Sequence, residues 1–75
     1  MANKYVIDKY NNVVVWNGDS TSHSDIAHAM FGEPVSAGFC HINGDRVDTY
    51  GESVSLGIES HKNDYSIIQD KLNLD

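Results

Sequence analysis

The sequence predicts a small α+β domain, in which two β-hairpins form an antiparallel sheet and two helices pack on one face of it. Two pairs of segments rich in β-branched and aromatic residues are each separated by an asparagine-containing turn, and a helical stretch follows each pair. The chain has 75 residues and 40% of them are hydrophobic, so we expect a single domain, residues 1–75, with a thin core. Helices are the means by which so short a chain covers a sheet face.

The first hairpin is predicted over Lys4–Tyr10 and Val13–Trp16, with Asn11 and Asn12 as a two-residue turn, because asparagine tolerates positive φ. With this turn, the side chains that point to the core face are those of Tyr5, Ile7, Val14 and Trp16. The other, open face then carries Val6, Asp8, Tyr10, Val13 and Val15. We expect Tyr10, Val13 and Val15 to form a self-association surface, since no third layer is left to cover them.

A helix is predicted over Thr21–Phe31. Its hydroxyl-rich start can cap the first turn, Asp25 suits the helix N-terminus, and Gly32 and Pro34 end the segment. The serines beside His23 could also suggest a nucleophilic site, but the chain has no nucleophile-elbow motif. Helix capping is therefore the better explanation of these serines.

The second hairpin is predicted over Phe39–Ile42 and Asp45–Tyr50, with the strong turn signal Asn43-Gly44 between them. This turn pairs Cys40 with Val47. The opposite, open face then carries Phe39, Asp48 and Tyr50, with Glu52 next in line. A turn of another length would reverse the assignment and place Phe39 inside.

The last third of the chain predicts a short strand and a second helix. Val54, Leu56 and Ile58 alternate as in a strand. After Ser60, a helical stripe follows over Tyr65–Leu72. The predicted order is therefore strand, strand, helix, then strand, strand, short strand, helix.

The net charge of −6 limits the classes of partner. Residues 32–60 hold Arg46 against five carboxylates, a net of −4. Nucleic-acid binding depends on lysine and arginine, of which the chain has five in all, so we expect no direct contact with nucleic acid or with an anionic membrane. A protein with a basic surface is the partner that this charge favours. With no membrane-length apolar run and a single cysteine, we expect a cytoplasmic protein.

We expect no catalytic residues, no metal and no cofactor, and therefore no enzyme. His23 and His28 are five residues apart and point in different directions on a helix. Cys40 and His41 point to opposite sides of a strand, which is the wrong geometry for a thiolate–imidazole pair. The glycines are scattered singly and form no phosphate-binding loop.

Several short motifs lie at Pro34–Phe39, Gly44–Val47, Tyr50–Ser53 and Ser55–Ile58, followed by Ser60, Asp64, Ile67, Ile68 and Leu72, and preceded by Ser22–Ala27. Together they resemble a group of small uncharacterised proteins encoded by bacteriophages and prophages, in which "SAGF" and "YGES.SLG" recur. The resemblance implies no residue roles. It implies a context, because small acidic phage proteins without catalytic motifs commonly bind and block a host protein.

Two functions therefore remain open. The first is a non-enzymatic accessory protein in the cytoplasm of a bacterial host, an acidic inhibitor of a nucleic-acid-binding or defence complex, of the anti-CRISPR or anti-restriction type. The second is a structural, assembly or adaptor protein that works as a small homodimer. For the first, we expect Phe39 and Tyr50 to anchor the partner while Asp45, Asp48 and Glu52 supply charge complementarity.

Overall fold

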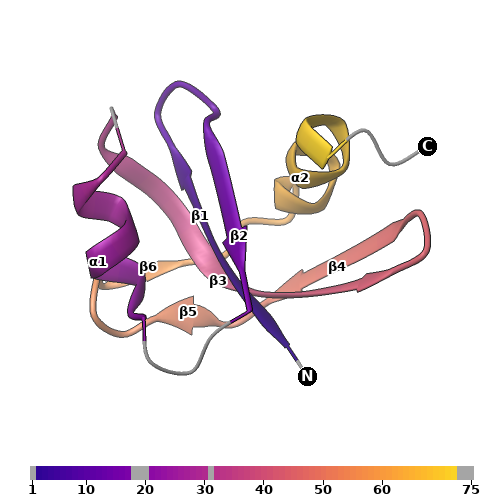
Figure 1. Ribbon diagram of the computed structural model, residues 1–75, viewed down its shortest axis with the longest axis horizontal. Coiled ribbons are helices and arrows are strands. Elements are labelled where there is room, and N and C mark those ends of the chain that lie inside the picture. Colours follow the sequence, from indigo (N-terminus) through magenta and orange to yellow (C-terminus); the bar gives the residue numbers. More distant parts are fainter. Residues whose placement is uncertain (1, 18–20, 31, 73–75) are drawn as a thin grey trace.

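The computed structural model describes residues 2–17, 21–30 and 32–72 (Figure 1). Four strands form an antiparallel sheet in the order β2-β1-β3-β4, and two short strands, β5 and β6, form a separate hairpin. The strands are β1 (Asn3–Asp8), β2 (Val13–Trp16), β3 (Pro34–Asn43), β4 (Arg46–Tyr50), β5 (Glu52–Ser53) and β6 (Ile58–Glu59), and the helices are α1 (His23–His28) and α2 (Asp64–Leu72). The predicted α+β class and the antiparallel sheet of two hairpins are confirmed.

The loop of the first hairpin is one residue longer than predicted. Asp8 and Asn12 close it, with the Asp8 amide donating to the Asn12 carbonyl at 3.0 Å, and Asn11 takes a φ of 62° inside it. The buried Asp8 carboxylate holds this loop by accepting hydrogen bonds from the amides of Tyr10, Asn12 and Gly32 and from the Asn12 side chain. These bonds lower the pKa of Asp8, although burial by itself, the largest single influence, acts to raise it.

The extra loop residue reverses the face of β2. Tyr5 lies opposite Val15, and Ile7 lies opposite Val13. Both valines therefore pack, partly buried, against the hydrophobic core, which consists of Tyr5, Ile7, Cys40, Val47 and Ile68. The prediction that Val13 and Val15 share an open face with Tyr10 is wrong, and so is the assignment of Val14 and Trp16 to the core face. Tyr10 itself is 62% exposed, in the loop.

The second hairpin keeps its predicted faces although its turn is displaced. The loop residues are Gly44 and Asp45, with Gly44 at a φ of 63°, and Cys40 pairs with Thr49 instead of Val47. A shift of two residues preserves the side on which every side chain lies. Cys40 and Val47 are buried in the core, as predicted.

The two helices lie on opposite faces of the sheet, and this is where the structure departs from the prediction of one shared face. Ile68 of α2 belongs to the core cluster. His23 of α1 instead packs edge-on against the rings of Trp16 and Phe39, at centroid distances of 5.5 and 5.6 Å. Trp16 and Phe39 are both register partners of Lys4, on the face opposite Tyr5. Figure 1 shows α1 and α2 on opposite sides of β1 and β2. A second covered face explains why Val6 is buried as well.

Helix α1 begins at His23, two residues later than predicted, and ends earlier, but the hydroxyl-rich segment caps it as predicted. Ser22 is its N-cap and forms a capping box with Asp25. The helix ends at His28, and Phe31, which the prediction included, lies outside the described residues.

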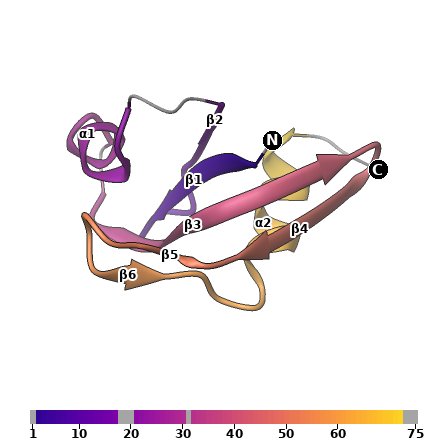
Figure 2. The ribbon, with the colours of Figure 1, turned by 90° about the horizontal axis from the view of Figure 1, so that it is seen from below.

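Most of the segment predicted as one strand over Val54–Ile58 is instead the turn of the β5–β6 hairpin, and its last residue, Ile58, begins β6. Gly57 adopts a φ of 66° and donates to the Ser53 carbonyl, while the Ser53 hydroxyl accepts from the Leu56 amide. This local hydroxyl–backbone bonding competes with an extended strand. The hairpin packs beside β3, where the Ser36 hydroxyl reaches the Glu59 carbonyl at 3.3 Å (Figure 2).

Candidate functional site

A row of aromatic rings crosses the outer face of the β3–β4 hairpin. Tyr50 stacks against Phe39 at 5.9 Å and against His41 at 6.1 Å, each at an interplanar angle of 25°. Phe39 is partly buried beneath His23, whereas Tyr50 is 44% exposed. The two predicted anchors are therefore in contact on one face, and Tyr50 is the one that solvent reaches more readily.

The charged residues of this hairpin are arranged differently from the prediction. Arg46 Nε lies 3.3 Å from Asp48 Oδ1, and both side chains are exposed, so part of the acidic charge is balanced within β4. Glu52 does not continue the face of Asp48 and Tyr50, because Gly51 takes a φ of 78° and the chain turns into β5. There Glu52 pairs directly with Glu59, and both are exposed. Two like charges at paired cross-strand positions repel each other.

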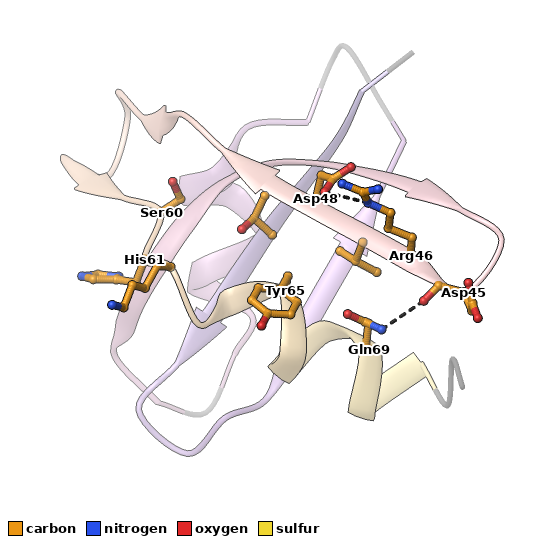
Figure 3. Close-up of a pocket in the computed structure, with 10 residues that line it drawn as sticks. Asp45, Arg46, Asp48, Ser60, His61, Tyr65 and Gln69 are labelled. Atoms are coloured by element: carbon orange, nitrogen blue, oxygen red, sulfur yellow. Dashed lines mark hydrogen bonds and ion pairs between the residues drawn. The ribbon is translucent and has the colours of Figure 1, made fainter.

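An open groove of about 820 Å³ runs between β4 and the first half of α2 (Figure 3). We call it the β4–α2 groove. Its lining residues are Asp45, Arg46, Val47, Asp48, Thr49, Ser60, His61, Lys62, Tyr65 and Gln69. Near the hairpin tip, Gln69 Nε2 donates to the Asp45 carbonyl at 3.0 Å. Of the predicted partner-binding residues, Asp45 and Asp48 line this groove, whereas Phe39, Tyr50 and Glu52 do not.

A buried polar network lies behind the groove, and the sequence did not reveal it. The hydroxyls of Tyr5 and Ser36 both donate to Asp64 Oδ2, which also accepts from the His61 amide at 2.9 Å. His61 Nδ1 lies 2.9 Å from Ser36 Oγ. Burial and the neighbouring Asp64 carboxylate raise the pKa of Tyr5, which keeps its phenol protonated as the donor.

The contact between Ser36 and His61 does not make a nucleophile. The Ser36 hydroxyl donates its hydrogen bond to Asp64, so it can only accept from His61 Nδ1, and in this arrangement His61 does not act as a base toward Ser36. Ser36 is also only 3% exposed, out of reach of a substrate. The network instead fixes the start of α2 against β1 and β3. Its members come from three separate segments of the chain, and the one sequence signal was an acidic residue at a helix start.

The remaining titratable groups form no further centre in the part of the chain that the structure describes. Burial raises the pKa of the Cys40 thiol to about 11, so this cysteine stays protonated in the core. Among residues 2–17, 21–30 and 32–72, no three histidine, cysteine, aspartate or glutamate side chains are grouped so as to hold a metal ion. Neither described helix has the length and apolar character needed to cross a membrane.

Comparison of the chain with protein-family models, with curated proteins and with solved structures finds no match. The resemblance to phage-encoded proteins therefore stays a prediction from short motifs.

Proposed function

We propose that this chain is a non-enzymatic binding protein whose β3–β4 hairpin contacts a partner protein with a basic surface. The observation that carries the proposal is Tyr50, a half-exposed ring held in place by stacking on Phe39 and His41. A large ring already fixed in position loses little conformational freedom on binding, which is the character of an interface anchor.

Charge supports the same class of partner. The net charge of the chain is −6, and Asp45 and Asp48 are exposed on this hairpin. Glu52 and Glu59 add a second exposed acidic pair on the neighbouring β5–β6 hairpin. Such a surface attracts proteins that bind nucleic acid through lysine and arginine. The finer proposal is an inhibitor of a host nuclease or defence complex, of the anti-CRISPR or anti-restriction type, that competes with nucleic acid for a basic channel.

The test is affinity purification of the tagged chain from a bacterial host at low salt, followed by binding kinetics with the recovered protein. Tyr50→Ala should weaken affinity by about 2 kcal/mol or more, chiefly through faster dissociation. The matched control is Tyr10→Ala, which removes an exposed tyrosine from the first hairpin and should leave affinity unchanged. Asp48→Lys combined with Glu52→Lys should chiefly slow association, and added salt should reduce that defect.

The recovered protein should also lose nucleic acid when the wild-type chain is added. The proposal is wrong if Tyr50→Ala binds like Tyr10→Ala, or if charge reversal leaves association unchanged at low salt. Each variant has to keep the wild-type melting curve for its result to count.

A further inference from the structure

Strand β4 is an unpaired edge of the four-stranded sheet. It pairs with β3 on one side, and no other described strand lies on its second side. Arg46 pairs with Asn43 at the end of a two-residue loop, where the two residues exchange both backbone hydrogen bonds. Because the pairing alternates along the strand, Val47 and Thr49 direct their backbone N–H and C=O groups away from β3.

This edge lacks two of the features that block pairing with another chain, proline and a β-bulge. Arg46–Tyr50 contains no proline and no bulge, and its pairing with β3 is regular. Helix α2 packs against the Val47 face of β4, and Gln69 Nε2 donates to the Asp45 carbonyl, but between the two elements the open β4–α2 groove leaves space beside the strand. The hairpin also projects to one side of the molecule (Figures 1 and 2), so another strand can approach it.

We propose that β4 pairs with β4 of a second copy of this chain, antiparallel, about a two-fold axis between the two Val47 residues. An axis of this kind makes the interface self-complementary. Val47 then exchanges two backbone hydrogen bonds with Val47 of the partner subunit. On either side, Arg46 lies opposite Asp48 of the partner subunit, and Asp48 lies opposite the partner's Arg46.

Three registers pair the outward backbone groups of Val47 and Thr49 with those of the second copy, and they place the two-fold axis at Val47, at Asp48 or at Thr49. The charges of the side chains favour the axis at Val47. An axis at Asp48 would place two carboxylates directly opposite each other, which destabilises a strand pair. An axis at Thr49 would leave Asp48 opposite the partner's Tyr50, without a counter-charge. The Val47 axis turns the exposed Arg46–Asp48 contact within one strand into a group of four alternating charges. These pairs lie at positions where cross-strand side chains approach most closely.

The dimer would join two four-stranded sheets into one. The axis is perpendicular to the sheet, so the stacked Phe39 and Tyr50 rings of both copies would face the same side. This inference does not rest on the proposed function, because its test measures association of the chain with itself in the absence of any other protein.

The test is sedimentation equilibrium of the wild-type chain from low micromolar to millimolar concentration, together with charge-swap variants. Arg46→Asp and Asp48→Arg should each weaken dimerisation about tenfold, because each sets two like-charge pairs against each other. The double variant Arg46→Asp/Asp48→Arg restores both opposite pairs and should dimerise like wild type. If repulsion between the net charges of the two copies controlled association instead, the pattern would differ. Asp48→Arg changes the net charge from −6 to −4 and would then strengthen association.

Disulfide trapping gives a second, independent measurement of the register. Arg46→Cys mixed with Asp48→Cys should form the mixed disulfide in preference to either homodimer under mild oxidation, because these two positions face each other. A wild-type chain that stays monomeric at millimolar concentration overturns the proposal. The proposal is also overturned if the double variant Arg46→Asp/Asp48→Arg does not dimerise like wild type, or if Asp48→Asn associates more tightly than wild type. Equal yields of the mixed disulfide and of the disulfide-linked homodimers of Arg46→Cys and Asp48→Cys would overturn it as well. All four residues of these pairs are exposed, and circular dichroism melting checks that each variant is folded.

Discussion

The two hairpins of the main sheet carry similar turn signals, yet their loops are held in opposite ways. In the first, the buried Asp8 carboxylate accepts four hydrogen bonds, one of them from Gly32 on the far side of α1. In the second, the loop is exposed, and a side chain added at Gly44 would meet nothing within 4 Å. The first loop is therefore a fixed junction between distant segments. The second is an exposed tip that is tied to α2 through the backbone carbonyl of Asp45, which leaves its side chains available as a surface.

The largest expected effect comes from removing the Asp8 carboxylate. Asp8→Ala leaves four donors without their acceptor, among them the buried Gly32 amide, so the free energy of unfolding should fall by about 3 kcal/mol. Asp45→Ala is the matched control at the second loop, where the exposed side chain should contribute no more than about 0.5 kcal/mol. Urea denaturation measures both. Equal losses would show that the two loops are held alike.

The same carboxylate should give the first hairpin a dependence on pH. Since the pKa of Asp8 is lowered by folding, its contribution is fully present above the unfolded value of about 3.9 and is lost as the pH falls through the lower folded value. The decrease in the free energy of unfolding on protonation of Asp8 cannot exceed the decrease caused by Asp8→Ala. Below pH 4, wild-type stability should fall more steeply than that of Asp8→Asn, in matched urea titrations. Parallel curves would contradict the assignment.

A smaller effect is expected from the reversed face of β2. Val15→Asp places a charge against the core beside Tyr5 and should cost about 2 kcal/mol. Tyr10→Asp, at a 62% exposed position of the same hairpin, should be nearly neutral. Thermal melting compares the two variants. A neutral Val15→Asp would restore the open-face assignment of this strand.

The smallest effect concerns the left-handed residues in the loops of the two main-sheet hairpins, Asn11 and Gly44, which have φ angles of 62° and 63°. Gly44→Ala should cost about 1 kcal/mol through backbone strain alone, because the added methyl group meets no neighbour. Gly44→Asn should cost less, since asparagine tolerates this conformation. Chemical denaturation separates the two. A loss in Gly44→Ala no larger than that in Gly44→Asn would show that the loop relaxes.

Local patterns predicted most of the elements and the faces of one hairpin. Strand β2, the capped start of α1 and the two-hairpin order follow from side-chain alternation, β-propensity and turn residues, which act over a few neighbouring positions. The face shared by Phe39, Asp48 and Tyr50 was also predictable, because the turn was misplaced by a two-residue change in register. Such an error leaves every side chain on its own side of the sheet.

Only the tertiary structure decided the faces of β2, the covered second face of the sheet and the groove. An error of odd size in the register reverses a strand, and here the loop length depends on a bond between Asp8 and Gly32, 24 residues apart. The network of Tyr5, Ser36, His61 and Asp64 likewise joins segments up to 59 residues apart. The sequence fixes which groups can donate and accept, but it takes folding to bring distant groups within hydrogen-bond distance of each other.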